Sequence, residues 1–199
     1  MLGRWRRGKA EEPAVLDHLA QLPAAAPALV TCGGLSPTGA GGVCLRAPDP
    51  AAYPSLEERL APILAATDPQ GSARFEQSTD EFGHRWLVRR TSVYDLDGLV
   101  ADLRSVNAAA VESGSAGALM CTMVAFTDAR NPPMALVFRA SRGTWYPFVP
   151  IADGDDVGSK RLATRDNPRE IAIGTALEGL LALEPDLSKW FPVWGAPVL

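Results

Sequence analysis

The sequence has 199 residues, of which 47% are hydrophobic and 21% are charged, and its formal net charge is -4 at pH 7. This composition predicts a folded chain with a substantial core and excludes a disordered one. The slight acidity argues against a nucleic-acid-binding protein, because such proteins usually present a basic face of clustered Lys and Arg.

Residues 1–12 are predicted to form a flexible basic tail that precedes a single α+β domain over residues 13–199. The tail is either a solvated end or a weak foothold on an anionic membrane surface. Its candidate membrane contacts are Arg4, Trp5, Arg6, Arg7 and Lys9. No apolar run approaches the ~20 residues that span a bilayer, and the first residues lack the apolar segment of a secretory signal. We therefore expect a cytoplasmic protein that can lie at the inner face of the membrane.

The first part of the domain alternates helix and strand patterns. Apolar residues at helical spacing predict a helix over residues 13–22 that stops at Pro23, and two short strands are expected at 28–32 and 42–46. The glycine-rich segment between these strands lacks the Lys-Ser or Lys-Thr of a phosphate-binding loop and is followed by a strand instead of a helix. We interpret it as a flexible turn.

A helix, a β-hairpin and a longer helix are predicted next. The first helix opens with a capping box at Ser55 and Glu58, in which each side chain satisfies a backbone donor. The long helix begins at Asp95 as its N-cap and ends at Gly114, and its apolar spacing is the strongest helix signal in the chain. The predicted ranges are 55–66 for the first helix, 73–79 and 84–92 for the hairpin strands, and 95–114 for the long helix.

A three-stranded meander follows, with strands expected at 119–126, 134–139 and 145–149. Its first strand is apolar on both faces, which predicts a central strand. After an acidic loop at 153–160, Asn167 and Pro168 are expected to start a last helix that Pro185 closes. The order α-ββ-α-ββ-α-βββ-α predicts an α+β fold, in which helices pack on a bent antiparallel sheet of about six or seven strands.

No catalytic or metal-binding motif is recognisable. His84 follows a turn that contains Asp80 and Glu81, yet neither a cysteine nor a further carboxylate adjoins it in the sequence, as the usual spacing of zinc ligands requires. We interpret His84 as an exposed histidine beside a turn and predict no catalytic residues, no metal site and no cofactor. An enzyme in which His84, Asp80, Glu81 or the acidic loop converge in the fold is the alternative.

The three cysteines, Cys32, Cys44 and Cys121, lie in apolar strand-like runs without a CxxC spacing. Their odd number and their surroundings indicate buried thiols in a reducing compartment. A disulfide between Cys32 and Cys44 is the alternative if their strands pair.

Two aromatic stretches, at 142–148 and 189–197, stand out from the rest of the chain. In one interpretation the C-terminal tail, residues 185–199, folds back and its aromatic side chains fill a groove beside the meander. In the other interpretation some of these side chains stay exposed and anchor a partner. The candidate partner-binding residues are Trp145, Tyr146, Phe148, Trp190, Phe191 and Trp194.

These stretches also carry a resemblance to a known family. The matching segments are DEFG at 80–83 with Trp86, FTD at 126–128, RGTWYPF at 142–148, EPDL at 184–187 and WFPVWGAP at 190–197, with LSPTG at 35–39 and GVC at 42–44. From about residue 13 to residue 199 the chain resembles the actinobacterial PspA-associated family PspAB. The basic tail departs from the more apolar amphipathic start of the members to which we compare it.

The resemblance implies an accessory protein of the phage-shock envelope-stress response that works with PspA, a membrane-binding coiled-coil protein, and with a membrane-embedded zinc protease. It implies no established activity and no catalytic residues. We therefore expect a non-enzymatic adaptor that binds PspA or another envelope-stress protein. The alternatives are a chaperone-like peptide binder with a fold like that of secretion chaperones, unrelated to stress signalling, and an unrecognised hydrolase or metal enzyme.

Overall fold

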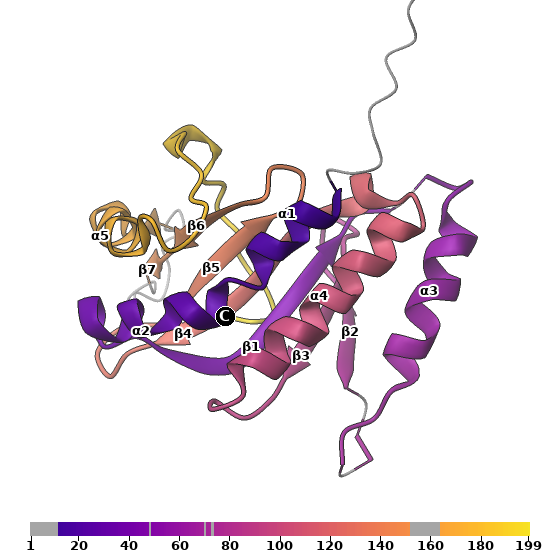
Figure 1. The fold of residues 1–199 in the computed structure, drawn as a ribbon, viewed down its shortest axis with the longest axis horizontal. Helices are drawn as coiled ribbons and strands as arrows, with labels where there is room; N and C mark the ends of the chain where they lie inside the picture. The colour runs from indigo at the N-terminus through magenta and orange to yellow at the C-terminus, as the bar shows by residue number, and fades with distance from the viewer. Residues whose placement is uncertain (1–11, 48, 70, 73, 152–163) are drawn as a thin grey trace, which may run out of the picture.

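The computed structural model describes residues 12–151 and 164–199, apart from residues 48, 70 and 73. Six antiparallel strands form its main sheet in the order β2-β3-β1-β4-β5-β6 (Figure 1). The strands are β1 (Ser36–Leu45), β2 (Phe75–Thr79), β3 (Arg85–Arg90), β4 (Leu119–Thr127), β5 (Met134–Arg139) and β6 (Thr144–Phe148). A second, two-stranded sheet pairs β7 (Pro150–Ile151) with β8 (Thr164–Arg165). The predicted α+β class is confirmed, and β4 is a central strand as expected.

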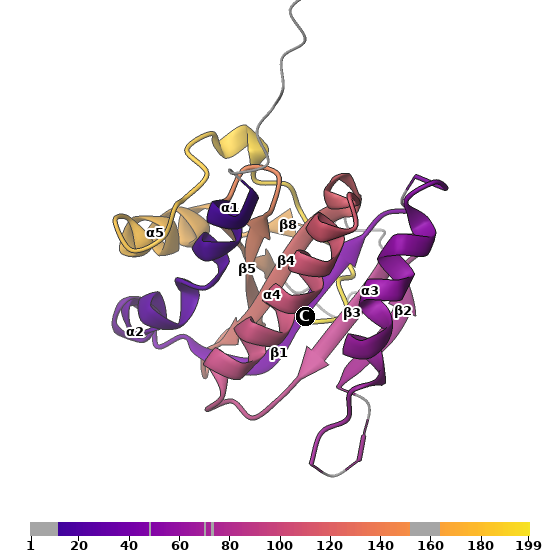
Figure 2. The same ribbon diagram turned by 45° about the vertical axis from the view of Figure 1, so that its right-hand side comes forward.

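Helices cover one face of the main sheet. They are α1 (Glu12–Leu19), α2 (Leu22–Gly33), α3 (Tyr53–Ala65), α4 (Leu96–Glu112) and α5 (Asn167–Leu177), with short 3₁₀ helices at Ala116–Ala118 and Leu187–Lys189. Figure 2 shows α4 lying along β1 and α3 in front of β2 and β3. Leu19, Leu60 and Leu103 from three of these helices share one core cluster with strand residues such as Val43 and Phe138. No helix in the described part of the chain is long and apolar enough to cross a membrane.

The C-terminal segment covers the opposite face of the sheet. Trp190, Ala196 and Val198 belong to a second core cluster with strand residues such as Trp86 and Met123. In Figure 1 this segment is yellow and passes on the far side of the sheet from α4. The alternation of side chains along each strand therefore serves two apolar layers, one built by helices and the other by an irregular segment.

The glycine-rich segment predicted as a flexible turn is instead part of β1, a central strand. An added Cβ at Gly41 would lie 2.8 Å from Leu103 Cδ1, on the helix side, and one at Gly42 would lie 3.0 Å from Val198 Cγ1, on the tail side. The two glycines thus let α4 and the tail approach the sheet closely from opposite faces. The prediction was wrong because glycine was taken as a sign of chain reversal.

The predicted strand at 28–32 is also wrong, because these residues belong to α2. Pro23 was expected to stop a helix, but it lies in the first turn of α2, where its missing N–H costs no hydrogen bond. Leu22, Ala25 and Leu29 are buried at helical spacing. The expected helix over 13–22 is therefore split between α1 and α2.

Helix α4 follows the prediction closely. The Asp95 side chain accepts a hydrogen bond from the Gly98 N–H at 3.0 Å, and Gly114 after the helix has a φ of 78°. Two other helix boundaries differ from the prediction. Helix α3 begins at Tyr53 and has no side-chain cap, so the Ser55 capping box does not form. Helix α5 is capped by Asp166 instead of Asn167 and ends at Leu177, well before Pro185.

Candidate functional site

Three of the six candidate partner-binding residues belong to β6 and are buried. Trp145 faces the helix side, where its Nε1 donates to the His18 carbonyl at 3.0 Å. Tyr146 and Phe148 face the C-terminal tail, and the Tyr146 hydroxyl donates to the Phe191 carbonyl at 3.0 Å. Burial raises the pKa of Tyr146 well above its usual value, so this hydroxyl stays protonated. None of the three is accessible to a partner in this structure.

Trp190 fixes the tail to the sheet. Its side chain is 9% exposed, and its ring stacks on Tyr146 with centroids 6.2 Å apart. Its Nε1 donates to the Glu184 carbonyl at 2.9 Å, and Arg165 Nη1 donates to the Trp190 carbonyl at 2.5 Å. The interpretation of the tail as groove-filling therefore holds for Trp190.

Phe191 and Trp194 are the two candidates that remain accessible. Their exposed fractions are 49% and 40%. The Arg139 guanidinium lies 5.2 Å from the Phe191 ring centroid, and Trp194 makes an edge contact with Phe148 at 4.9 Å between centroids. Each ring thus contacts a neighbouring side chain and stays partly exposed, which is the arrangement of an interface anchor.

Two further exposed apolar side chains lie on α5 and the 3₁₀ helix Leu187–Lys189. Ile171 and Leu187 are 51% and 55% exposed, and they line a hollow of about 380 Å³ together with Trp190 and Arg165. Arg165 also lies 5.5 Å from the centroid of the buried Phe148 ring, which Trp194 contacts. We call Ile171, Leu187, Phe191 and Trp194 the tail surface.

Two buried carboxylates hold the backbone under the tail surface. Glu184 accepts from Arg142 Nε at 2.7 Å and from the Thr144 hydroxyl at 3.1 Å. Glu170 accepts from the Val149 N–H at 2.8 Å and from Arg165 Nε. Burial raises the pKa of Glu170 by more than these partners lower it. Both carboxylates are occupied by partners within the chain and connect the segments that lie beside the tail.

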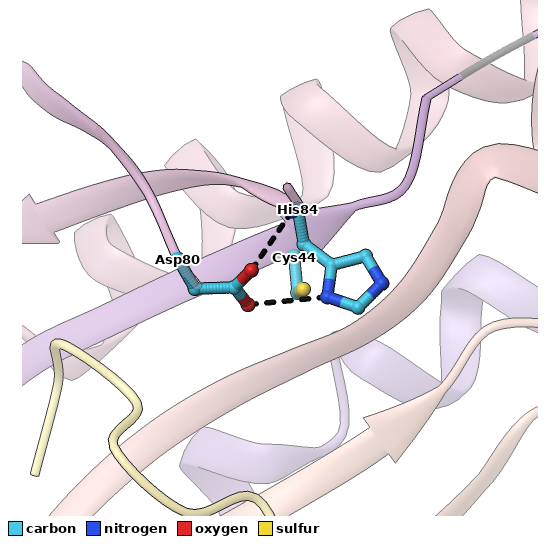
Figure 3. Close-up of side chains that lie close together, drawn as sticks. All are labelled: Cys44, Asp80 and His84. Atoms are coloured by element: carbon cyan, nitrogen blue, oxygen red, sulfur yellow. Dashed lines mark hydrogen bonds and ion pairs between the residues drawn. The ribbon is translucent and has the colours of Figure 1, made fainter. Parts of the chain in front are cut away.

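A second group of side chains, with atoms of the kinds that ligate metals, gathers at the β2–β3 turn. One donor atom each from Cys44, Asp80 and His84 lies within 4.8 Å of the others (Figure 3). Asp80 Oδ2 lies 3.1 Å from His84 Nδ1, and Asp80 Oδ1 accepts from the His84 N–H at 2.8 Å. Sequence reasoning missed this group because Cys44 comes from β1. Cys44 pairs with Trp86 in the sheet, and this pairing places the thiol beside the turn.

The charge of this group is set by its hydrogen bonds. Burial alone raises the pKa of Asp80, but donors from the His84 and Phe82 N–H groups, the Trp86 indole and the His84 ring outweigh it, and the pKa lies below its ordinary value. Cys121, paired with Cys44 across β1 and β4, has a raised pKa because of its hydrogen bond with Cys44 and its burial. Cys121 is therefore a neutral thiol at pH 7.

The remaining site predictions have mixed outcomes. All three cysteines are free, so the alternative Cys32–Cys44 disulfide is absent, and Cys32 is exposed because it lies in α2 instead of a buried strand. The ring of His18 contacts the Gly143 carbonyl at 2.8 Å and takes no part in the Cys44 group. The candidate membrane contacts from Arg4 to Lys9 and the acidic loop at 153–160 lie outside the described residues.

Comparison with known proteins gives one family. The model of PspAB, PspA associated protein B, matches residues 1–198. No curated protein and no solved structure matches the chain. Because the family model covers nearly every residue, the chain belongs to the PspAB family of PspA-associated proteins.

Proposed function

We propose that this protein is a non-enzymatic accessory of the phage-shock envelope-stress response that binds PspA through the tail surface. The family description, which names an association with PspA, supports the choice of partner. The observation that carries the proposal is the half-exposure of Phe191 and Trp194 on a tail that buried Trp190, Ala196 and Val198 anchor to the sheet. Aromatic side chains held in this way are typical of interface anchors, because little conformational entropy is lost when a partner covers them.

The shape of the tail surface suits a helical partner. The resemblance to the PspAB family implies that PspA is a coiled-coil protein, and an amphipathic helix binds by placing its apolar stripe against an apolar hollow. The hollow between Ile171 and Leu187, with a volume of about 380 Å³, has room for one or two large aliphatic side chains of such a helix.

Calorimetric titration with purified PspA tests the proposal. Phe191→Ala and Trp194→Ala are each expected to weaken binding by about 30-fold, which corresponds to the ~2 kcal/mol that defines an interface hot spot. Tyr94→Ala is the matched control, because Tyr94 is an exposed aromatic residue that precedes α4, far along the chain from the tail. Circular dichroism should show the same fold for all three variants. Equal affinities for the wild type and both tail variants would contradict the proposal.

A second candidate function, chaperone-like peptide binding, is favoured by a hollow at the other end of the sheet. This hollow has a volume of about 400 Å³ and lies between the end of β1 and the start of α3. Leu45, Pro50, Tyr53 and Leu56 give it an apolar wall, and Glu57 and Arg85 form an ion pair at 2.5 Å beside it. An apolar side chain of an extended peptide could be buried here.

The two functions are distinguished by separate variants. If the protein binds unfolded peptides, Tyr53→Ala should weaken binding of a fluorescently labelled unfolded polypeptide and leave the affinity for folded PspA unchanged. Tyr53 is half exposed, so the substitution should leave the core intact. Binding of PspA with no measurable affinity for the unfolded probe would exclude the second function.

A further inference from the structure

We propose that Cys44, Asp80 and His84 form a binding site for a divalent cation of the zinc class. Cys44 comes from β1, Asp80 and His84 come from the turn between β2 and β3, and the three side chains converge in Figure 3. Ligand atoms around a tetrahedral zinc ion lie ~3–4 Å from one another, given bond lengths of ~2.0–2.3 Å. The donor atoms here lie within 4.8 Å of one another, so small side-chain movements would bring them to bonding distance.

The combination of donor atoms indicates the kind of cation. A thiolate, an imidazole nitrogen and a carboxylate oxygen are the three ligand types that zinc takes, whereas calcium and magnesium prefer oxygen ligands alone. Zinc sites with three protein ligands leave a fourth position for a water molecule or a bound group. Asp80 and His84 retain 22% and 28% exposure of their side chains, so the site has an open side through which an ion can enter.

The carboxylate ligand is held in place by groups that do not themselves bind the ion. Asp80 Oδ1 accepts from the Phe82 N–H at 3.0 Å and from the His84 N–H at 2.8 Å. Asp80 Oδ2 accepts from Trp86 Nε1 at 3.1 Å. Donors of this kind, which orient a ligand in advance, are a regular feature of metal sites. Trp86 is itself fixed, because it is 3% exposed and packs in the core under the tail.

The surroundings of Cys44 favour a role as a metal ligand over a role as a thiol nucleophile. Cys44 is only 4% exposed, so its sulfur is out of reach of a substrate of ordinary size. A reactive cysteine needs partial exposure, whereas a metal ligand needs only a path by which the ion can reach it. The inference concerns binding of an ion and assigns no reaction, so it does not depend on the proposed association with PspA.

Titration of the metal-free full-length chain with Co²⁺ tests the site. Co²⁺ replaces Zn²⁺ in such sites, and a bound thiolate gives a ligand-to-metal absorption band in the near ultraviolet. We expect one equivalent of Co²⁺ to bind with this band, and Zn²⁺ to displace it. Cys44→Ser should abolish the band. Cys32→Ser, which removes the exposed thiol of α2, should leave it unchanged.

A second pair of variants tests the histidine. His84→Gln should weaken Zn²⁺ binding by more than the ~10- to 100-fold that loss of an orienting partner costs. His18→Gln is the matched control, because the chain has only these two histidines. His84 is partly exposed, so His84→Gln is expected to fold, and this comparison can be made even if Cys44→Ser fails to fold. Absence of the thiolate band at stoichiometric Co²⁺, or equal Zn²⁺ affinities for His84→Gln and the wild type, would overturn the proposal.

Discussion

Replacement of Trp190 by alanine tests whether the C-terminal tail is an integral layer of the fold. The Trp190 ring lies between α5 and β6: a Cβ added at Gly174 would lie 3.2 Å from the ring, and the Tyr146 ring is stacked on its other side. Its indole N–H also satisfies the Glu184 carbonyl. Trp190→Ala would therefore remove the contact that joins the tail, a helix and an edge strand.

The expected cost follows from the burial of the ring. A buried Trp→Ala substitution destabilises a protein by about 3–5 kcal/mol, through lost transfer free energy and the cavity that remains. The carbonyl of Glu184 would also lose its donor, which costs a further ~1 kcal/mol where water cannot replace it. Since domains of this kind are stable by about 5–15 kcal/mol, the loss is a large part of the total. If the tail only lay on a sheet that is stable without it, Trp190→Ala would lower the free energy of unfolding by less than ~1 kcal/mol.

Urea unfolding followed by far-ultraviolet circular dichroism measures this cost. Trp194→Ala is the matched control, because Trp194 is a tryptophan of the same tail with 40% exposure and one edge contact with Phe148. We expect this control to lose only about 0.5–1.5 kcal/mol. Similar losses for the two variants, or a loss below ~1 kcal/mol for Trp190→Ala, would refute the view that the tail is the second core layer of the sheet.

Three further predictions concern the core, a loop and the sheet surface. Asn107→Ala leaves the buried Thr122 hydroxyl without its partner at 2.8 Å, so the free energy of unfolding in urea should fall by about 1–3 kcal/mol, and an unchanged value would contradict the importance of this pair. Hydrogen bonds from the backbone after Asp128 lower the pKa of its carboxyl, so its stabilising effect is present above the unfolded value of about 4 and is lost as the pH falls through the folded value. The stability difference between the wild type and Asp128→Asn should therefore shrink below about pH 4, and a difference that is constant from pH 6 to pH 3 would exclude this mechanism. Gly42→Val places a side chain against Val198 at 3.0 Å and should speed amide hydrogen exchange in the last residues of the tail, as measured by mass spectrometry; exchange as slow as in the wild type would show that the tail end does not pack on β1.

The meander was predictable because its signals are local. Leu119 to Thr127 is apolar except at Thr122 and Thr127, and the turns that follow carry Asp, Asn, Pro and Gly, so strand ends and hairpins follow from neighbouring residues. The α4 boundaries were predictable for the same reason, since Asp95 caps its own helix. Segment 28–33 was not predictable in this way, because its one buried residue, Leu29, shows helical spacing only together with Leu22 and Ala25.

The candidate sites show the same difference between local sequence signals and contacts between distant segments. The sequence drew attention to the aromatic stretches, but it did not separate buried Trp190 from exposed Phe191, because both are adjacent aromatic residues in one irregular segment. The Cys44, Asp80 and His84 group escaped sequence analysis, since 36 residues separate the thiol from the carboxylate by their numbers in the chain. Only the pairing of β1 with β3 brings them together.

By itself, the sequence determined the α+β class, the meander, the long helix α4 and membership of the PspAB family, because periodicity, caps and motifs are properties of residues close together in the chain. The tertiary structure alone decided that β1 is a central strand, that the tail forms the second core layer, and which aromatic rings stay open to a partner. The physical reason is that these features depend on burial and close approach between distant segments: Gly41 and Gly42 form a strand because α4 and the tail press on opposite faces of the same sheet.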